Sequence, residues 1–200
     1  MMAIASGPLL PLTVSDVRQH MYCPRIPYFR LGLRLPHRFV TGAMQEGILE
    51  HQHTTDLEHR RSLRAYGVED GERRFDVFMR SVHLDLTGRL DMVICRSSEV
   101  IPVEFKNSRD EVGLNHKYQL AAYALLAGDH FAKPVRRTFV YFIPTKQARA
   151  VEISPAMRAY ARRVLNDVRR AVAEERMPDG TRVHGRCAVC EFLPYCNDRW

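Results

Sequence analysis

The chain has 200 residues, enough for one domain with a substantial core, and its 46% hydrophobic and 26% charged residues are ordinary for a globular protein. Thirty Lys and Arg against 23 Asp and Glu give a net charge of +7, with arginine far outnumbering lysine. Arginine matches phosphate geometry, so this charge favours a polyanionic partner, although a merely soluble basic surface explains it equally well. The N-terminal segment lacks a cationic leader and no apolar run approaches membrane-spanning length, so we expect a cytoplasmic protein without a membrane partner.

The N-terminal half predicts two helices followed by strands. The first helix begins in "TVSDVRQHMYCPR", with Thr13 as N-cap, Asp16 three residues later and Pro24 at its end. A second helix is expected over residues 42–67, up to Gly67. Strands are expected at 75–80, 82–87, 89–95 and 99–105, with "TGR" as a tight connection and "RSSE" as a turn.

The C-terminal half predicts a helix over 114–127 that ends at Gly128, then strands within "RTFVYFIP" and "RAVEI". A long helix follows over about 155–176, and a loop then leads to a cysteine-rich tail. This pattern predicts a single mixed α/β domain over residues 1–200, with a central sheet flanked by helices.

The segment "IPVEFKNS" carries the first chemical signal. On a pleated strand Glu104 and Lys106 point to one face, and Phe105 points to the other. Asp91 lies thirteen residues upstream in the preceding strand, so the two carboxylates can converge where the strands pair. Two close carboxylates need a proton or a cation between them, and hard oxygen ligands suit Mg²⁺ or Mn²⁺. The alternative interpretation is ordinary surface ion pairing.

Two helices carry further candidates. His51 could supply a nitrogen ligand, although a lone histidine is more often a surface or core residue. Gln119 and Tyr123 are four residues apart and share one helix face, where they could orient the lysine or bind phosphate. An ordinary amphipathic helix with Tyr123 in the core explains the same spacing.

Together these residues resemble the motif series of the RecB-like branch of PD-(D/E)xK nucleases. The matching motifs are Gly47-x₃-His51, Gly88-x₂-Asp91, Glu104-Phe-Lys106 and Gln119-x₃-Tyr123. The resemblance implies a PD-(D/E)xK fold in which the metal is bound by His51, Asp91, Glu104 and the backbone carbonyl of Phe105. It also implies that Lys106 is the catalytic lysine and that Gln119 and Tyr123 support it.

The five cysteines are more plausibly ligands or core thiols than disulfides in a reducing compartment. Cys187-x₂-Cys190-x₅-Cys196 provides three closely spaced thiolates, and a tetrahedral zinc or a cubane cluster needs a fourth. Cys95 ends an apolar strand and is best explained as a core thiol. Cys23 lies at a helix end, where the helix-breaking Pro24 could present its thiolate, so both cysteines stay candidates for the fourth ligand. Four cysteines suit zinc and iron–sulfur equally well.

An N-terminal "CPR" cysteine together with a C-terminal triplet, on either side of the RecB-type motifs, resembles the iron–sulfur nucleases. The length of the chain makes it most similar to the CRISPR-associated Cas-four exonuclease family. That resemblance implies a [4Fe–4S] cluster on Cys23, Cys187, Cys190 and Cys196 that joins the N- and C-terminal segments. It also implies trimming of DNA ends in CRISPR adaptation beside an integrase, to which some members are fused.

We therefore expect a metal-dependent nuclease that acts on single-stranded DNA or overhangs, with Mn²⁺ or Mg²⁺ at the carboxylates. Arginines would hold the DNA backbone, and Tyr22, Phe29 or Tyr118 could stack on a base. The alternatives are a non-catalytic DNA-binding or adaptor module with a structural metal or cluster, and an endonuclease that depends on partner proteins.

Overall fold

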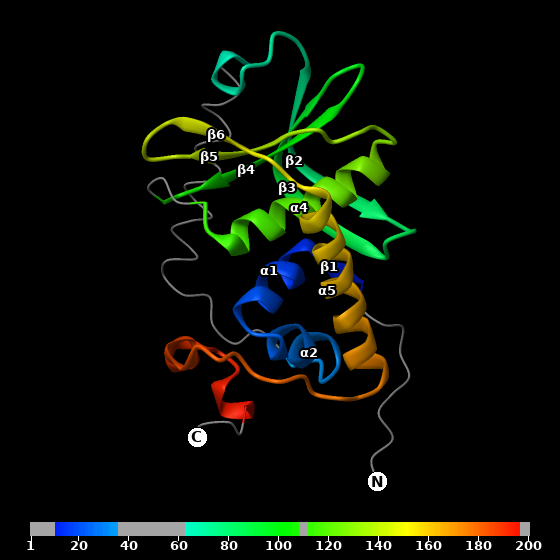
Figure 1. Ribbon diagram of the computed structural model, residues 1–200, viewed down its shortest axis with the longest axis vertical. Coiled ribbons are helices and arrows are strands. Elements are labelled where there is room, and N and C mark those ends of the chain that lie inside the picture. Colours follow the sequence, from blue (N-terminus) through cyan, green and yellow to red (C-terminus); the bar gives the residue numbers. More distant parts are fainter. Residues whose placement is uncertain (1–10, 36–62, 109–111, 197–200) are drawn as a thin grey trace.

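A computed structural model describes residues 11–35, 63–108 and 112–196 of the chain (Figure 1). Its helices are α1 (Val14–Tyr22), α2 (Arg25–Leu31), α4 (Leu114–His130) and α5 (Pro155–Ala173). The strands are β1 (Leu12–Thr13), β2 (Glu72–Ser81), β3 (Leu86–Cys95), β4 (Val100–Lys106), β5 (Thr138–Phe142) and β6 (Gln147–Val151). Short 3₁₀ turns are η1 (Leu63–Tyr66), η2 (His184–Val189) and η3 (Leu193–Tyr195). Among the described helices, none is long and apolar enough to cross a bilayer.

The strands form one mixed sheet in the order β1-β3-β4-β5-β6, with β2 paired to β3 as well. β3 runs antiparallel to β2 and β4, whereas β4 and β5 are parallel and are joined by the crossover helix α4. In Figure 1, α4 crosses beneath the sheet, α1, α2 and α5 lie further below, and the tail lies at the bottom. The predicted central mixed sheet flanked by helices is confirmed.

Each face of the sheet has its own apolar cluster. One cluster joins α1, α4 and α5 to the sheet through residues such as Val14, Leu126 and Val164. The other is rich in aromatic residues and gathers Tyr66, Phe105 and Tyr141 on the opposite face. Side chains alternate along β4, so Phe105 belongs to the aromatic cluster and its neighbours Glu104 and Lys106 point towards α4. The prediction that Glu104 and Lys106 share one face of the strand and that Phe105 points to the other is confirmed.

The first helix begins as predicted. Asp16 accepts a hydrogen bond from the Thr13 backbone nitrogen at 2.7 Å, in the arrangement of a capping box. The same carboxylate is 1% exposed and accepts from Arg30 Nε at 2.8 Å, which joins α1 to α2. Pro24 ends α1 as expected, and a second helix, α2, starts directly after it, which the sequence pattern does not predict.

Two boundary predictions were wrong for packing reasons. "TGR" is no turn: it lies inside β3, and the hairpin turn falls at 82–85, since Ser81 pairs with Leu86. Gly88 is instead required by close approach, because a Cβ there would lie 2.9 Å from Val14 Cγ2. Likewise α4 continues through Gly128 to His130, and Ala132, with φ of +50°, takes the left-handed position after the helix. The predicted helix over 42–67 lies mostly outside the described residues.

Candidate active site

The pairing of β3 with β4 places two acidic residues side by side. Met92 pairs with Val103, so the antiparallel register brings Asp91 next to Glu104. Asp91 Oδ2 accepts a hydrogen bond from the backbone nitrogen of Phe105 at 2.6 Å, which fixes the carboxylate against β4. The predicted convergence of the two carboxylates on neighbouring strands is therefore confirmed.

Glu104 is buried at the centre of a polar network. Its Oε1 accepts hydrogen bonds from Lys106 Nζ at 2.6 Å and from Gln119 Nε2 at 2.9 Å. Burial, and then the negative charge of Asp91, raise the pKa of Glu104, while the Lys106 and Arg18 charges act in the opposite direction. A surface ion pair would be exposed, whereas the Glu104 and Lys106 side chains are 9% and 14% exposed. The ordinary surface pairing considered above does not describe this site.

Helix α4 contributes two polar side chains to the site. Gln119 and Tyr123 lie one turn apart, and both are 4% exposed. Tyr123 donates from its hydroxyl to the backbone carbonyl of Arg89 at 2.5 Å, on the strand that carries Asp91. Burial, followed by the charges of Glu104 and Asp91, raises the pKa of Tyr123 well above its usual value, so the phenol stays protonated. Gln119 Oε1 is buried and has no hydrogen-bond partner among the residues that the structure describes.

Arg18 is a neighbour of this site that sequence reasoning missed. It lies on α1, and its positive charge lowers the pKa of both Glu104 and Tyr123 against the stronger effect of burial. Nothing in the sequence around Arg18 distinguishes it from the other arginines. Its position near the site follows only from the packing of α1 against α4, so no sequence pattern could have identified it.

His51, the predicted nitrogen ligand, and Gly47 lie outside the described residues. Within residues 11–35, 63–108 and 112–196, no three His, Cys, Asp or Glu side chains are placed to hold a metal ion together. The described part of the candidate site therefore consists of two carboxylates, a lysine, an amide and a phenol.

The four cysteines predicted as cluster ligands lie far apart in sequence but line one small pocket. Cys23, Cys187, Cys190 and Cys196 contribute to it, and all are free thiols. Arg25 Nη1 lies 3.1 Å from Cys196 Sγ, and Phe29 stacks on Phe192 with ring centroids 5.5 Å apart, so α2 and the tail are packed together. Cys95 does not line this pocket; it lies at the end of β3, where it is partly buried and packs against the core rather than within it. A bound cluster is not shown by this arrangement.

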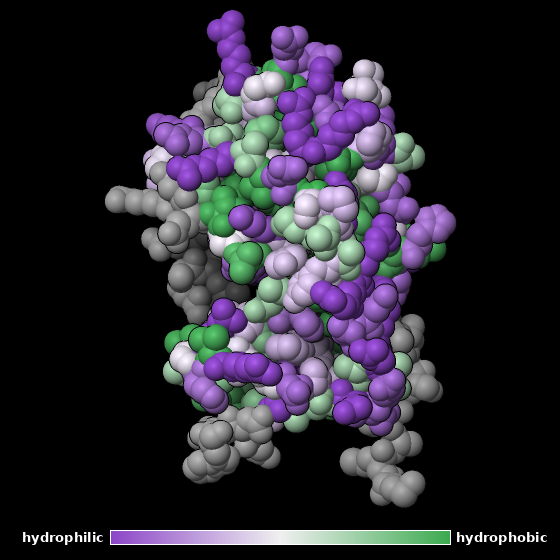
Figure 2. All heavy atoms as spheres, in the orientation of Figure 1, coloured by the Kyte–Doolittle hydropathy of each residue, from purple (hydrophilic) through white to green (hydrophobic). Residues whose placement is uncertain are grey.

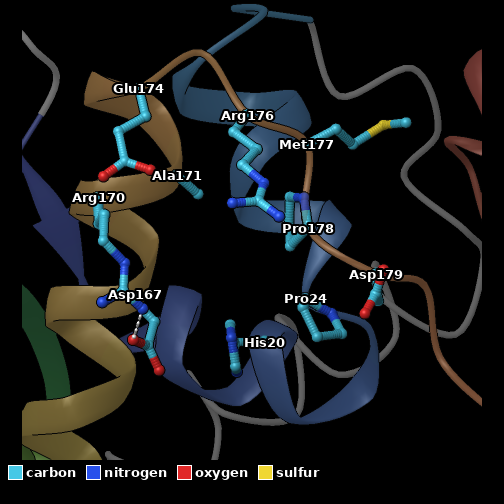
Figure 3. A pocket seen from close by; sticks show the side chains of 10 residues that line it. All are labelled: His20, Pro24, Asp167, Arg170, Ala171, Glu174, Arg176, Met177, Pro178 and Asp179. Atoms are coloured by element: carbon cyan, nitrogen blue, oxygen red, sulfur yellow. Dashed lines mark hydrogen bonds and ion pairs between the residues drawn. The ribbon is translucent and has the colours of Figure 1, made fainter.

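A second cavity, of about 450 Å³, lies between α1, α5 and the segment after α5 (Figure 3). His20 and Arg176 point into it from opposite sides, and Asp167 pairs with Arg170 on its wall at 2.7 Å. None of the predicted site residues lines this cavity. Because His20 and Arg18 are two residues apart on α1, they point to different faces of the helix, so this cavity is separate from the Glu104 site.

The mixed sheet, the paired carboxylates and the neighbouring lysine are the features of a PD-(D/E)XK nuclease. The model of the PD-(D/E)XK nuclease superfamily matches residues 30–197. The chain is 32% identical over 191 residues to the CRISPR-associated exonuclease Cas4 of Francisella tularensis subsp. novicida (strain U112), covering 95% of both chains. The chain belongs to this superfamily and, within it, to the Cas4 exonuclease family, which makes it a CRISPR-associated nuclease.

Two other similarities concern architecture. The chain is 24% identical over 206 residues to a fusion of exonuclease Cas4 and endonuclease Cas1 from Geobacter sulfurreducens, covering 96% of this chain and 34% of that protein. The crystal structure of SSO0001 covers 99% of this chain, with a TM-score of 0.58 at 19% identity and 90% of its own length covered. The second similarity supports the fold alone.

Proposed function

We propose that this chain is a metal-dependent DNA nuclease that cleaves single-stranded DNA or overhangs and trims prespacer ends for CRISPR adaptation. The observation that carries the proposal is the buried network of Asp91, Glu104, Lys106 and Gln119. A structural ion pair would not need a second carboxylate beside it, because that carboxylate adds repulsion. A site that binds a cation does need both.

The donor set fits a divalent metal. Glu104 and Asp91 present hard oxygen ligands, and the raised pKa of Glu104 reflects burial first and the charge of Asp91 after it, against the opposite effect of Lys106. Asp91, Glu104, the Phe105 carbonyl and His51 would hold the ion, and a nitrogen ligand favours Mn²⁺ over Mg²⁺. When bound, the ion supplies positive charge that offsets the carboxylates and polarises the phosphate.

The chain's own residues then have separate tasks. Lys106, now 2.6 Å from Glu104, can position or deprotonate the attacking water and stabilise negative charge on the phosphate. Gln119 holds Glu104 in place through its 2.9 Å hydrogen bond. Tyr123 stays protonated and holds the backbone of β3 at Arg89, two residues from Asp91. Gln119 and Tyr123 are thus positioning residues.

Cleavage of end-labelled single-stranded DNA tests the proposal. With Mn²⁺ we expect products that EDTA abolishes and that Glu104→Ala and Lys106→Ala both lose, whereas the exposed Glu152→Ala variant retains them. Cleavage that survives both active-site substitutions would place the site elsewhere. If the wild-type protein gives no products, alone or with Cas1, the chain is a DNA-binding adaptor.

We also propose that Cys23, Cys187, Cys190 and Cys196 bind a [4Fe–4S] cluster. Four thiols line one pocket and match in number the ligands of such a cluster, and the charges of the other three raise the pKa of Cys190, after burial. Binding would have to draw the sulfur atoms together, because no three side chains of the described residues are already placed to hold a metal ion. Such a cluster would hold α2 and the tail together. Zinc is the competing occupant.

Anaerobic purification followed by iron, sulfide and zinc analysis distinguishes a [4Fe–4S] cluster from bound zinc. We expect about four iron and four sulfide per chain. Serine substitution of Cys23 or Cys190 should remove them, whereas Cys95→Ser should not. Stoichiometric zinc without sulfide would overturn the cluster assignment and leave the nuclease proposal untouched.

The integrase partner is proposed from the family. Because a Cas4 relative is fused to Cas1, the two activities work within reach of each other in that protein. For this chain we expect association with Cas1, measured as co-elution of the two purified proteins with a prespacer DNA. Separate elution under these conditions would contradict a stable complex.

A further inference from the structure

Arg25 is a buried cation in the cysteine pocket, and neither the nuclease site nor the proposed cluster ligands account for it. It is the first residue of α2, follows Pro24 in the "CPR" segment, and is 7% exposed. Arginine is rarely buried to this extent unless its neighbours offer hydrogen-bond acceptors or negative charge. The groups around its guanidinium therefore indicate its role.

The guanidinium of Arg25 joins three segments that lie far apart in the chain. Its Nε donates to the carbonyl of Pro178 at 2.8 Å, in the segment after α5, and its Nη1 donates to Cys196 Sγ at 3.1 Å, in the tail. The backbone at Gly180 lies against the same group, since a Cβ there would be 3.6 Å from Arg25 Cζ. One side chain of α2 thus holds a thiol that we propose as a ligand.

No carboxylate is found among the described residues that line this pocket. Beyond the four cysteines, its polar and charged lining consists of Tyr22, Thr181 and two cations, Arg25 and Arg186. Four thiolates bound to Zn²⁺ or to a [4Fe–4S]²⁺ core would leave a net charge of about −2. Such a charge is costly to bury unless cations lie beside it, and a guanidinium bonded to one of the sulfur atoms provides one. The lining therefore fits a group held by thiolates.

The two cations of the pocket are bonded differently. Arg186 Nη1 donates to the carbonyls of Met21 and Tyr22 at 3.1 and 2.9 Å, and its Cζ lies 5.1 Å from the centroid of the Tyr22 ring. Among the described contacts, Arg25 donates to a ligand sulfur and Arg186 donates to backbone oxygens. Arg186 is therefore a matched control, because it places a positive charge in the same pocket without that sulfur contact.

The tail has little apolar core of its own. Within residues 184–196, Phe192 alone is buried, and no residue of η2 or η3 is. Val183 and Val189 are 51% and 82% exposed, and Figure 2 shows apolar side chains at the surface over the tail at the lower left. Few contacts thus hold the tail to α2, so the loss of one buried polar link should affect the tail cysteines.

We propose that Arg25 is a positioning residue for the thiolate site: it holds Cys196 in the pocket and offsets the negative charge of the bound thiolates. The inference rests on the proposed site at Cys23, Cys187, Cys190 and Cys196. It applies to a cluster and to zinc alike, because it concerns the sulfur atoms and their charge. It also gives the arginine of the "CPR" segment a task separate from DNA binding.

Retention of the bound metal is the first measurement. Holoprotein purified anaerobically is mixed with excess chelator, and the release of iron or zinc is followed. Groups that orient metal ligands typically contribute about ten- to a hundredfold to metal affinity, so we expect about tenfold faster release from Arg25→Met. Arg25→Lys keeps the charge and should recover part of the loss, whereas Arg186→Met should change release much less. Far-UV circular dichroism shows that each variant is folded, and Arg25→Gln is the second neutral variant should Arg25→Met not fold.

The reduction potential is a readout that a merely structural link would not change. It is measured on the iron-loaded protein by titration with dithionite, followed by electron paramagnetic resonance. The reduced cluster carries one more negative charge, so loss of the Arg25 cation should lower the potential. A tenfold change in the ratio of the two oxidation states corresponds to about 59 mV for one electron, and we expect a shift of this order in Arg25→Met. Arg25→Lys and Arg186→Met should shift less.

The outcomes separate this inference from the cluster proposal. Equal release and equal potential in Arg25→Met and the wild type, or equal changes in Arg25→Met and Arg186→Met, would overturn the role of Arg25 and leave the cluster assignment intact. Zinc without iron and sulfide would overturn the cluster, and faster zinc release from Arg25→Met would then still support the role of Arg25, whereas unchanged release would overturn it. Wild-type protein that holds neither metal would overturn both. DNA cleavage enters none of these measurements, so the nuclease proposal is decided separately.

Discussion

Gly88 lies in β3, where side chains of α1 and α4 pack close against the strand backbone. A Cβ at this position would lie 2.9 Å from Val14 Cγ2 and 3.1 Å from both Leu126 Cδ2 and Tyr123 Cε1. Val14 and Leu126 are fully buried and Tyr123 is 4% exposed, so these neighbours have little room to move. Replacing glycine by alanine inside a strand should favour folding by roughly 0.5–1 kcal/mol, while overpacking costs about 1–3 kcal/mol. We therefore expect Gly88→Ala to destabilise the protein by about 1–2 kcal/mol.

Urea unfolding followed by circular dichroism measures this change. Gly185→Ala is the matched control, because a Cβ at Gly185 would meet nothing within 4 Å, and its free energy of unfolding should match the wild type or exceed it slightly. In a double-mutant cycle, Val14→Ala should relieve part of the Gly88→Ala penalty, since it removes the nearest methyl group. Equal stability of Gly88→Ala and wild type, or strict additivity in the cycle, would refute the packing argument.

Three further predictions concern single side chains. Glu104→Gln should raise the urea midpoint in EDTA while it abolishes cleavage, because burial and Asp91 already disfavour the charged carboxylate; a lowered midpoint would contradict this. Asp16→Ala should cost about 3 kcal/mol in urea unfolding, because it leaves the partly buried Arg30 without its partner; a loss under 1 kcal/mol would contradict that role. Burial lowers the pKa of His20 against the opposite effect of Asp167, so the unfolded chain binds the extra proton and stability should fall as pH drops below about 6.5. His20→Gln should flatten the urea midpoint between pH 7.5 and 5.5, and an unchanged slope would assign the pH dependence to other groups.

Much of the candidate site was predictable because its signals are local. The alternation of Glu104, Phe105 and Lys106 follows from the two-residue period of a strand, and the shared face of Gln119 and Tyr123 follows from the helical period. The capping box at Thr13 and Asp16 is likewise a short-range pattern, and the structure has it. These features can be predicted without knowing which elements pack against them.

Errors arose where one residue type serves two purposes. Glycine marks turns and helix ends, but it also marks places where elements touch closely. At Gly88 the close contact with α1 and α4 is the reason for glycine. Its interpretation as a turn residue placed a turn, wrongly, in the middle of β3. At Gly128 the helix continues, because Ala132 takes the left-handed position instead. Both outcomes depend on neighbours that are distant in sequence.

The sequence by itself determined the alternation of buried and functional positions, the acidic pair with its lysine, and the cysteine spacing, because each depends on backbone periods or ligand counts. Only the tertiary structure decided that the charge of Arg18 acts on Glu104, that Cys23 lines the same pocket as the tail cysteines, and that a groove opens between α1 and the tail. The physical reason is that α1 reaches these positions by burying Val14 and Val17 against α4 and the sheet. Such packing depends on the shape of surfaces far apart in the chain, and no local pattern encodes it.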